Sequence, residues 1–89
     1  MLARIRRALR ITSIAFDNEI QDLIDAAIAD LGDGGISNLS ETDPLIIQAV
    51  ILYARSNFGL ENAESEKFAV RYNHLKTQLA LSGEYTRHV

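Results

Sequence analysis

The residues of this chain that could support catalysis or bind a metal are few and scattered. His74 and His88 are its only histidines, and it has no cysteine. No acidic residue lies three or four positions from His74, so the pattern favours a structural or solvent-exposed histidine over a metal ligand or general base. The absence of cysteine excludes disulfides, zinc ribbons, iron–sulfur sites and thiol catalysis, and it suits a reducing compartment.

Two other patterns resemble functional sites but fail in detail. Glu19, Asp22, Asp25 and Asp30 follow neither EF-hand nor Glu-x-x-His spacing, which favours a solvated or partner-facing surface over a cation site. The glycine-rich run 32–35 follows a predicted helix and lacks a subsequent Lys-Ser/Thr, so it predicts a helix stop instead of a phosphate-binding loop. No Gly-x-Ser-x-Gly elbow is present. We therefore expect no catalytic residue, no cofactor, no metal and no enzymatic activity.

Charge is strongly segregated along the chain, although the net charge is only −3. Residues 1–11 carry four arginines and no acid. Residues 12–66 carry eleven acids and one base, and residues 67–89 carry four bases and one acid. Basic ends and an acidic middle can pair within one fold or between neighbouring copies, and solvated faces that segregate by chance are an equal alternative.

The length and the hydrophobic pattern predict one soluble domain, 1–89. A chain of 89 residues has a thin stability margin, for which oligomerisation is one usual remedy. The longest apolar run, 44–54, is far shorter than the roughly 20 residues that span a bilayer. The N-terminal arginines interleave with apolar residues, unlike a secretory signal. We expect a cytoplasmic protein with no membrane partner.

The third predicted helix has the strongest structural signal. Asp43 is a good N-cap, and Pro44 fits the first helical position, where no N–H is needed. The helix is then apolar nearly all the way round, apart from a narrow polar edge of Gln48, Arg55 and Ser56. Such a helix must be covered on several sides, so we expect it to be the central rod of the fold.

Helical periodicity divides the whole chain, and no strand pattern competes with it. The predicted fold class is an all-α bundle of four or five helices around the central one, without a sheet. The predicted helices span about residues 2–10, 18–31, 44–58 and 63–81, and residues 83–89 are expected to form a flexible tail.

The ends and buried faces of these helices can also be predicted. We expect Asp17 to cap the second helix, Asn62 or Ser65 to cap the fourth, and Gly59 to stop the third. The predicted buried stripes are Ile20, Leu23, Ile24, Ala27, Ile28 and Leu31 on the second helix, and Phe68, Tyr72, Leu75 and Leu79 on the fourth.

Several short sequence motifs follow one another between about residue 2 and residue 81. They are Leu9-Arg10-Ile11-Thr12, the stretch from Phe16 to Ala27, Asp30-Leu31 with the glycine-rich break to Ile36, the stretch from Asp43 to Val50, Asn57-Phe58-Gly59, and Phe68 with Tyr72 and Leu75-Lys76. Together they resemble the small head–tail connector proteins of tailed bacteriophages and prophages, also called adaptor or DNA-packaging proteins. The family usually has a longer C-terminal stretch, of which only residues 84–89 are present here.

The resemblance implies a structural role without catalysis. Members of the family are helical subunits that assemble into a ring, commonly of about a dozen copies, beneath the portal protein of a filled head. The ring extends the DNA channel, through which DNA passes without sequence-specific binding, and it offers a platform for a head-closure or tail protein. The implied location is the head–tail junction of the virion, with the host cytoplasm before assembly.

A ring subunit needs two different complementary faces, one for each neighbour. We expect the basic first and fourth helices to supply one face and the acidic second helix to supply the other. The candidate contact residues are Arg4, Arg7, Arg10, Glu19, Asp22, Asp25, Arg71 and Lys76. Asp22 and Asp25 are also candidates for the channel lining, because acidic side chains would repel phosphate and let DNA slide.

Two other functions remain open from the sequence. One is a small prophage-type DNA-binding regulator, whose N-terminal arginine helix would contact backbone phosphates in a salt-sensitive manner. The other is a generic helical protein-interaction module, such as an antitoxin or an enzyme inhibitor, which would form small oligomers without a hole.

Overall fold

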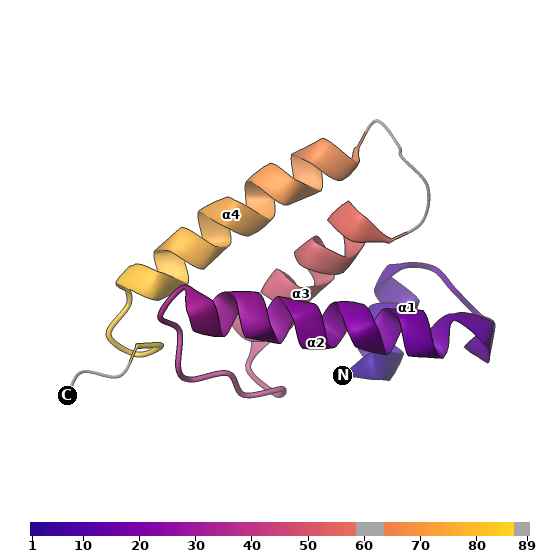
Figure 1. Ribbon diagram of the computed structural model, residues 1–89, viewed down its shortest axis with the longest axis horizontal. Coiled ribbons are helices and arrows are strands. Elements are labelled where there is room, and N and C mark those ends of the chain that lie inside the picture. Colours follow the sequence, from indigo (N-terminus) through magenta and orange to yellow (C-terminus); the bar gives the residue numbers. More distant parts are fainter. Residues whose placement is uncertain (59–63, 87–89) are drawn as a thin grey trace.

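The central helix predicted from the sequence organises the fold. The computed structural model describes residues 1–58 and 64–86. In chain order it contains α1 (Leu2–Ala8), the short 3₁₀ helix η1 (Ile14–Phe16), α2 (Asp17–Asp33), α3 (Pro44–Asn57) and α4 (Ser65–Leu81) (Figure 1). α3 packs against α1, α2 and α4. The described residues form no strand, so the predicted all-α class is confirmed.

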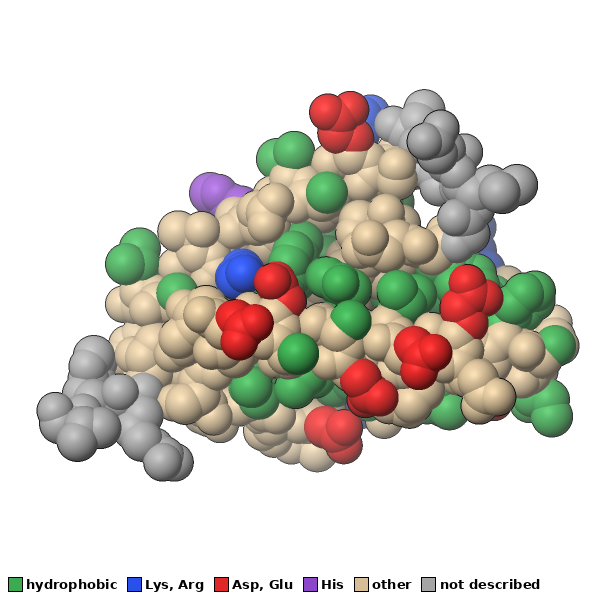
Figure 2. All heavy atoms as spheres, viewed as in Figure 1, with side chains coloured by type: hydrophobic (Ala, Val, Ile, Leu, Met, Phe, Trp, Pro, Cys, Tyr) green, Lys and Arg blue, Asp and Glu red, His purple; other side chains and the backbone are tan. Residues whose placement is uncertain are grey.

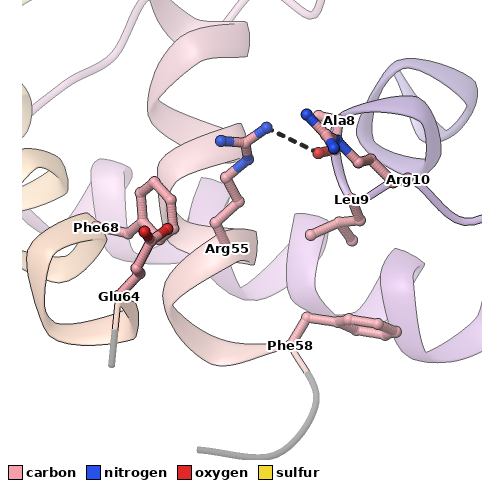
Figure 3. A pocket seen from close by; sticks show the side chains of 7 residues that line it. All are labelled: Ala8, Leu9, Arg10, Arg55, Phe58, Glu64 and Phe68. Atoms are coloured by element: carbon pink, nitrogen blue, oxygen red, sulfur yellow. Dashed lines mark hydrogen bonds between the residues drawn. The ribbon is translucent and has the colours of Figure 1, made fainter. Parts of the chain in front are cut away.

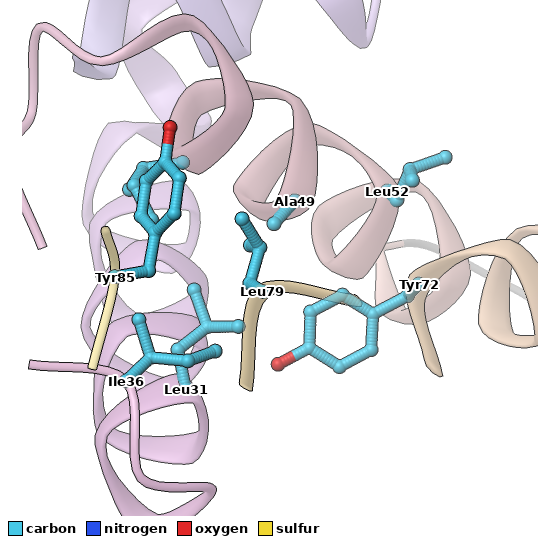
Figure 4. Close-up of a cluster of buried hydrophobic side chains, with 8 residues drawn as sticks. Leu31, Ile36, Ala49, Leu52, Tyr72, Leu79 and Tyr85 are labelled. Carbon is cyan, nitrogen blue, oxygen red and sulfur yellow. The ribbon is translucent and has the colours of Figure 1, made fainter. Parts of the chain in front are cut away.

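α3 is apolar on most of its surface because it separates two hydrophobic clusters. On one side, Ala49 and Leu52 pack with the end of α2, with α4 and with Tyr85 (Figure 4). On the other side, Val50 and Ala54 pack with α1 and the first part of α2. A helix that faces two clusters cannot have one narrow apolar stripe, which explains the sequence pattern.

The start of α3 follows the sequence signals closely. Asp43 is the N-cap, and its Oδ1 accepts hydrogen bonds from the N–H groups of Leu45 and Ile46 at 2.9 and 3.3 Å. Pro44 occupies the first helical position. These bonds satisfy two N–H groups that have no partner within the helix, so the beginning of the central helix is fixed.

α1 ends at Ala8, two residues before the predicted end. The N–H of Arg10 donates to the Arg7 carbonyl and the N–H of Ile11 to the Arg6 carbonyl, both at 3.0 Å. This is the Schellman pattern, in which the residue after the C-cap is left-handed. Arg10 takes that position with a φ of 59°, which is unfavourable for a residue with a side chain. No glycine marks this stop in the sequence.

The N-terminus of α2 differs from the prediction. Phe16 is at the N-cap position without a capping side chain, and Asp17 is the first residue of the helix instead of its cap. The capping side chain belongs to Ser13, whose Oγ accepts the N–H of Ala15 at the start of η1. Asp17 is instead paired with Arg6 on α1, which the local sequence does not indicate.

The C-terminus of α2 uses the glycines as predicted, although the helix continues to Asp33. Gly35 has a φ of 94° and Ile36 donates its N–H to the Leu31 carbonyl, a second Schellman pattern. Leu31 and Ile36 are both buried in the same cluster, which is the hydrophobic contact that usually accompanies this motif.

α4 begins at Ser65, with Glu64 at the N-cap position and no capping hydrogen bond from its side chain. Ser65 is therefore the first helical residue and not the cap. The other two predicted end signals, Asn62 and Gly59, lie outside the described residues. On the predicted stripe of α4, Tyr72 and Leu79 are buried.

Residues 83–86 were expected within a flexible tail, yet they form a turn packed on the core. Tyr85 is only 8% exposed. Its carbonyl accepts the N–H groups of Ser37 and Asn38, at 2.8 and 3.2 Å, so this turn holds the connection between α2 and α3. Residues 87–89 lie outside the described part of the chain.

Candidate interaction surfaces

The arginines of the N-terminal segment have two different roles. Arg4, Arg7 and Arg10 are exposed, as a partner surface requires. Arg6 is only partly exposed, and two nitrogens of its guanidinium donate to the Asp17 carboxylate. Nε lies 2.9 Å from Oδ1 and Nη2 lies 2.8 Å from Oδ2. One of the four positive charges is thus neutralised inside the fold.

The three acids of α2 that were predicted to be contact residues face solvent. Glu19, Asp22 and Asp25 are exposed, opposite the buried side of the helix that carries Ile20 and Ile24. Figure 2 shows acidic side chains spaced along α2 on one face of the molecule. Asp25 accepts a hydrogen bond from Gln21 one turn earlier, and no ion pair to these three acids occurs within residues 1–58 and 64–86.

Lys76, a predicted contact residue, is engaged inside the chain. Its Nζ lies 3.0 Å from Oδ2 of Asp30, and the Tyr72 hydroxyl donates to the same oxygen at 2.5 Å. The hydrogen bonds from Tyr72 and Lys76 lower the pKa of Asp30. Burial, reinforced by Asp30, raises the pKa of Tyr72 above its usual range. This group joins the C-terminal half of α2 to α4, whereas Arg71 remains exposed.

A hollow of about 410 Å³ lies between the end of α1, the end of α3 and the start of α4 (Figure 3). Arg55 extends across it from α3. Its Nη2 donates to the Ala8 carbonyl at 2.9 Å, and its guanidinium carbon lies 5.3 Å from the centre of the Phe68 ring. A cation suits both contacts, because the C-terminus of a helix and the face of an aromatic ring are negative.

The role of Arg55 was not predicted from the sequence. The residue was recognised as part of the polar edge of α3, but its two partners lie 47 residues earlier and 13 residues later in the chain. The available signal in the sequence was that Arg55 is the only base among residues 12–66, which carry eleven acids. The geometry shows that Arg55 on α3 contacts both α1 and α4, so we interpret the role of Arg55 as structural.

Within the described ranges, no three His, Cys, Asp or Glu side chains converge on one point. His74 is exposed on α4, and His88 lies outside the described residues. No helix in the described part of the chain is both long and apolar enough to cross a bilayer.

The chain is similar to a known protein family. The sequence model of a family described as phage connector protein matches residues 1–86, which include every described helix. The chain belongs to the phage connector family. The resemblance predicted from the sequence is therefore confirmed, and the family is a structural one. No curated protein and no solved structure matches the chain.

Proposed function

We propose that this connector is the subunit of a homo-oligomeric ring at the head–tail junction of a virion. The ring, of about a dozen copies, lies beneath the portal protein, extends the DNA channel and carries a head-closure or tail protein. Before assembly the subunit resides in the host cytoplasm. The observation that carries this proposal is the family match over residues 1–86.

The charged surfaces support assembly between copies. Arg4 and Arg7 are exposed on α1 and Glu19 and Asp22 on α2, and in the described ranges neither pair is neutralised by an ion pair within the chain. Two unlike faces on one subunit favour a head-to-tail contact, which closes into a ring when the rotation is suitable. Arg10, Asp25 and Arg71 are also exposed, the last of them on α4. Lys76 contributes less than predicted because Asp30 neutralises it.

The acidic face of α2 also suits passage of DNA. Binding to duplex DNA is dominated by cations that contact phosphate, so a wall of carboxylates does not retain it. Asp22 and Asp25 are exposed and project from a continuous helix, and they are our candidates for the channel wall. DNA is then a passing partner that is not recognised by sequence.

The experiment is to determine particle mass and shape at high protein concentration, by mass photometry and negative-stain imaging, in low and high salt. We expect rings with a central hole that weaken in high salt and on Arg4→Glu/Arg7→Glu reversal. Glu41→Lys, which reverses an exposed charge on the α2–α3 connection, is the control for a charge reversal outside these faces and should leave the mass unchanged. A mass that ignores both salt and the α1 reversal contradicts charge-driven assembly.

The same samples separate the two alternatives. Small compact oligomers without a hole would favour the helical interaction module. Salt-sensitive binding of duplex DNA, measured by fluorescence anisotropy and lost in the Arg4→Glu/Arg7→Glu variant, would favour the DNA-binding regulator.

A further inference from the structure

Large hydrophobic side chains that remain in water lie at three places on the described part of the molecule, one of which is Leu45 in the first turn of α3, 45% exposed. Ile14 and Phe16 on η1 are 74% and 45% exposed, and Val70 and Leu81 on α4 are 65% and 83% exposed. Single exposed hydrophobic residues are common, but Ile14 and Phe16 lie together in one short turn, and Val70 and Leu81 lie on the same side of α4, about three turns apart. The charged faces discussed above do not account for them.

The η1 corner, residues 14–16, is held in a fixed position. The Ser13 cap lies at its start, and the Arg6–Asp17 pair lies immediately after it. The ring of Phe16 packs edge-on against the ring of Phe58, with 5.7 Å between the ring centres. Ile14 is therefore presented to solvent by an anchored turn, so its exposure is not a consequence of a loose connection.

The outer face of α4 provides a matching hollow. Val70 and Leu81 point away from the buried side that carries Tyr72 and Leu79. This hollow is a shallow, open depression on one side of α4, and it is lined by Glu66, Lys67, Val70 and Arg71 of this helix. Both bases are exposed. This surface is apolar at its centre and has two positive charges and one negative charge at its rim.

The corner and the hollow are complementary in chemistry and lie on different elements of the subunit. Glu19 lies in the first turn of α2, directly after the corner, and is exposed. Asp17 is already paired, so Glu19 is the first acid beyond the corner that is available to Lys67 and Arg71. Figures 1 and 2 place η1 at one end of the molecule and the outer edge of α4, with its protruding hydrophobic side chains, on a different margin.

We propose that the η1 corner of one copy docks in the Val70 hollow of the next copy, with Glu19 facing Lys67 and Arg71. This inference rests on the proposed ring, because a contact between two unlike surfaces on different sides of a subunit is head-to-tail and repeats from copy to copy. It buries Ile14 and Val70 together.

The test uses cysteine crosslinking, for which the chain gives no background because it has no cysteine of its own. Ile14→Cys and Val70→Cys alter exposed side chains, so both variants should fold normally. The two proteins are mixed in equal amounts at high concentration, treated with a short bismaleimide and analysed on denaturing gels, with the linked peptides identified by mass spectrometry. The matched control pairs Ala29→Cys, on the exposed side of α2, with Val70→Cys.

We expect at least tenfold more crosslinked product from the 14–70 pair than from the 29–70 pair. Glu19→Lys should lower the 14–70 yield by roughly two- to fivefold, as expected for an exposed ion pair, and adding Lys67→Glu/Arg71→Glu on the partner should restore it. Equal yields from the two pairs, or no 14–70 product at all, would overturn the inference.

The outcome also separates this inference from the ring itself. Rings seen by imaging without a 14–70 crosslink overturn the docking geometry and leave the proposed function standing. Crosslinked open chains of the Ile14→Cys/Val70→Cys double variant, without closed particles, support the docking geometry and contradict ring closure.

Discussion

The hydroxyl of Tyr85 donates to both carboxylate oxygens of Asp43, at 3.0 Å to Oδ1 and 2.9 Å to Oδ2. The same carboxylate caps α3, so the C-terminal turn stabilises the first turn of the central helix. The hydrogen bonds from Tyr85, Ile46 and Leu45 outweigh the effect of desolvation and lower the pKa of Asp43. The end of the described chain thus reinforces the element on which the rest of the fold packs.

Replacing Tyr85 by Phe should lower the melting temperature. The ring would still fill its place in the cluster, but the Asp43 carboxylate would lose a donor and its hold on α3 would weaken. The measurement is thermal unfolding followed by circular dichroism. Tyr53→Phe is the matched control, because Tyr53 packs edge-on against Tyr72 through its ring and its hydroxyl makes no hydrogen bond to residues 1–58 or 64–86. Equal shifts for the two variants would show that the Tyr85 hydroxyl does not matter.

Stability should fall in acid because of Asp30 and Asp43. Their folded-state pKa values are lowered, so their contribution is fully present above the unfolded pKa of about 3.9 and is lost as the pH falls through the folded values. The free energy of unfolding from denaturant titrations should therefore decrease below about pH 4. Tyr72→Phe should flatten this dependence, since it removes the largest cause of the Asp30 shift, whereas Tyr53→Phe should leave it unchanged.

At high pH, the free energy of unfolding should decrease as the pH rises, because of Tyr72 and Tyr85. The pKa values of Tyr72 and Tyr85 are raised, by burial and by Asp30 for Tyr72 and by the bond to Asp43 for Tyr85. Their contribution is present below the unfolded tyrosine pKa of about 10 and is lost as the pH rises further. Absorbance titration of the phenols, with unfolding monitored in parallel, should show these two ionising together with unfolding. Two tyrosines that ionise at the ordinary pKa in the folded protein would contradict the prediction.

Arg10→Gly should stabilise the protein by roughly 0.5–1 kcal/mol, because glycine adopts the left-handed conformation of that position without steric cost. Arg7→Gly should destabilise it by about 1 kcal/mol, because it places glycine inside α1. Both variants remove one exposed arginine, so their net charges match. Denaturant titration measures both effects, and shifts of the same sign would contradict the interpretation of Arg10 as a strained helix stop.

The sequence predicted those parts of the fold that depend on local signals. Asp43 and Pro44 gave the start of α3, and the apolar spacing gave the buried face of α2. The end of α1 was missed because Arg10, and no glycine, takes the left-handed position. The packed turn at residues 83–86 was not predicted, because Tyr85 is held by hydrogen bonds to residues that lie more than 40 positions earlier in the chain. A segment without periodicity gives no sign of such contacts.

The candidate surfaces were predictable to a similar degree. Exposure of Arg4, Arg7, Glu19 and Asp22 follows from helical periodicity, which places them opposite the buried residues. The pairing of Lys76 with Asp30 depends on how α4 crosses the end of α2, and that angle is set by tertiary packing. For the same reason the sequence did not single out η1 as an anchored apolar corner.

The Arg6–Asp17 pair should contribute about 0.5–1 kcal/mol to stability, near the top of the range for solvent-accessible pairs, because it is bidentate and both side chains are about three-quarters buried. The coupling energy is measured by a double-mutant cycle of Arg6→Gln and Asp17→Asn, with Asp25→Asn as a control for loss of an acid from α2. Exchange of the two residues, Arg6→Asp with Asp17→Arg, should recover only part of the loss. The attraction is restored, but an arginine at the first position of α2 faces the positive end of the helix dipole. Full recovery would show that the pair acts by charge alone, and no coupling would mean that the η1 corner is held by Ser13 and Phe16 without it.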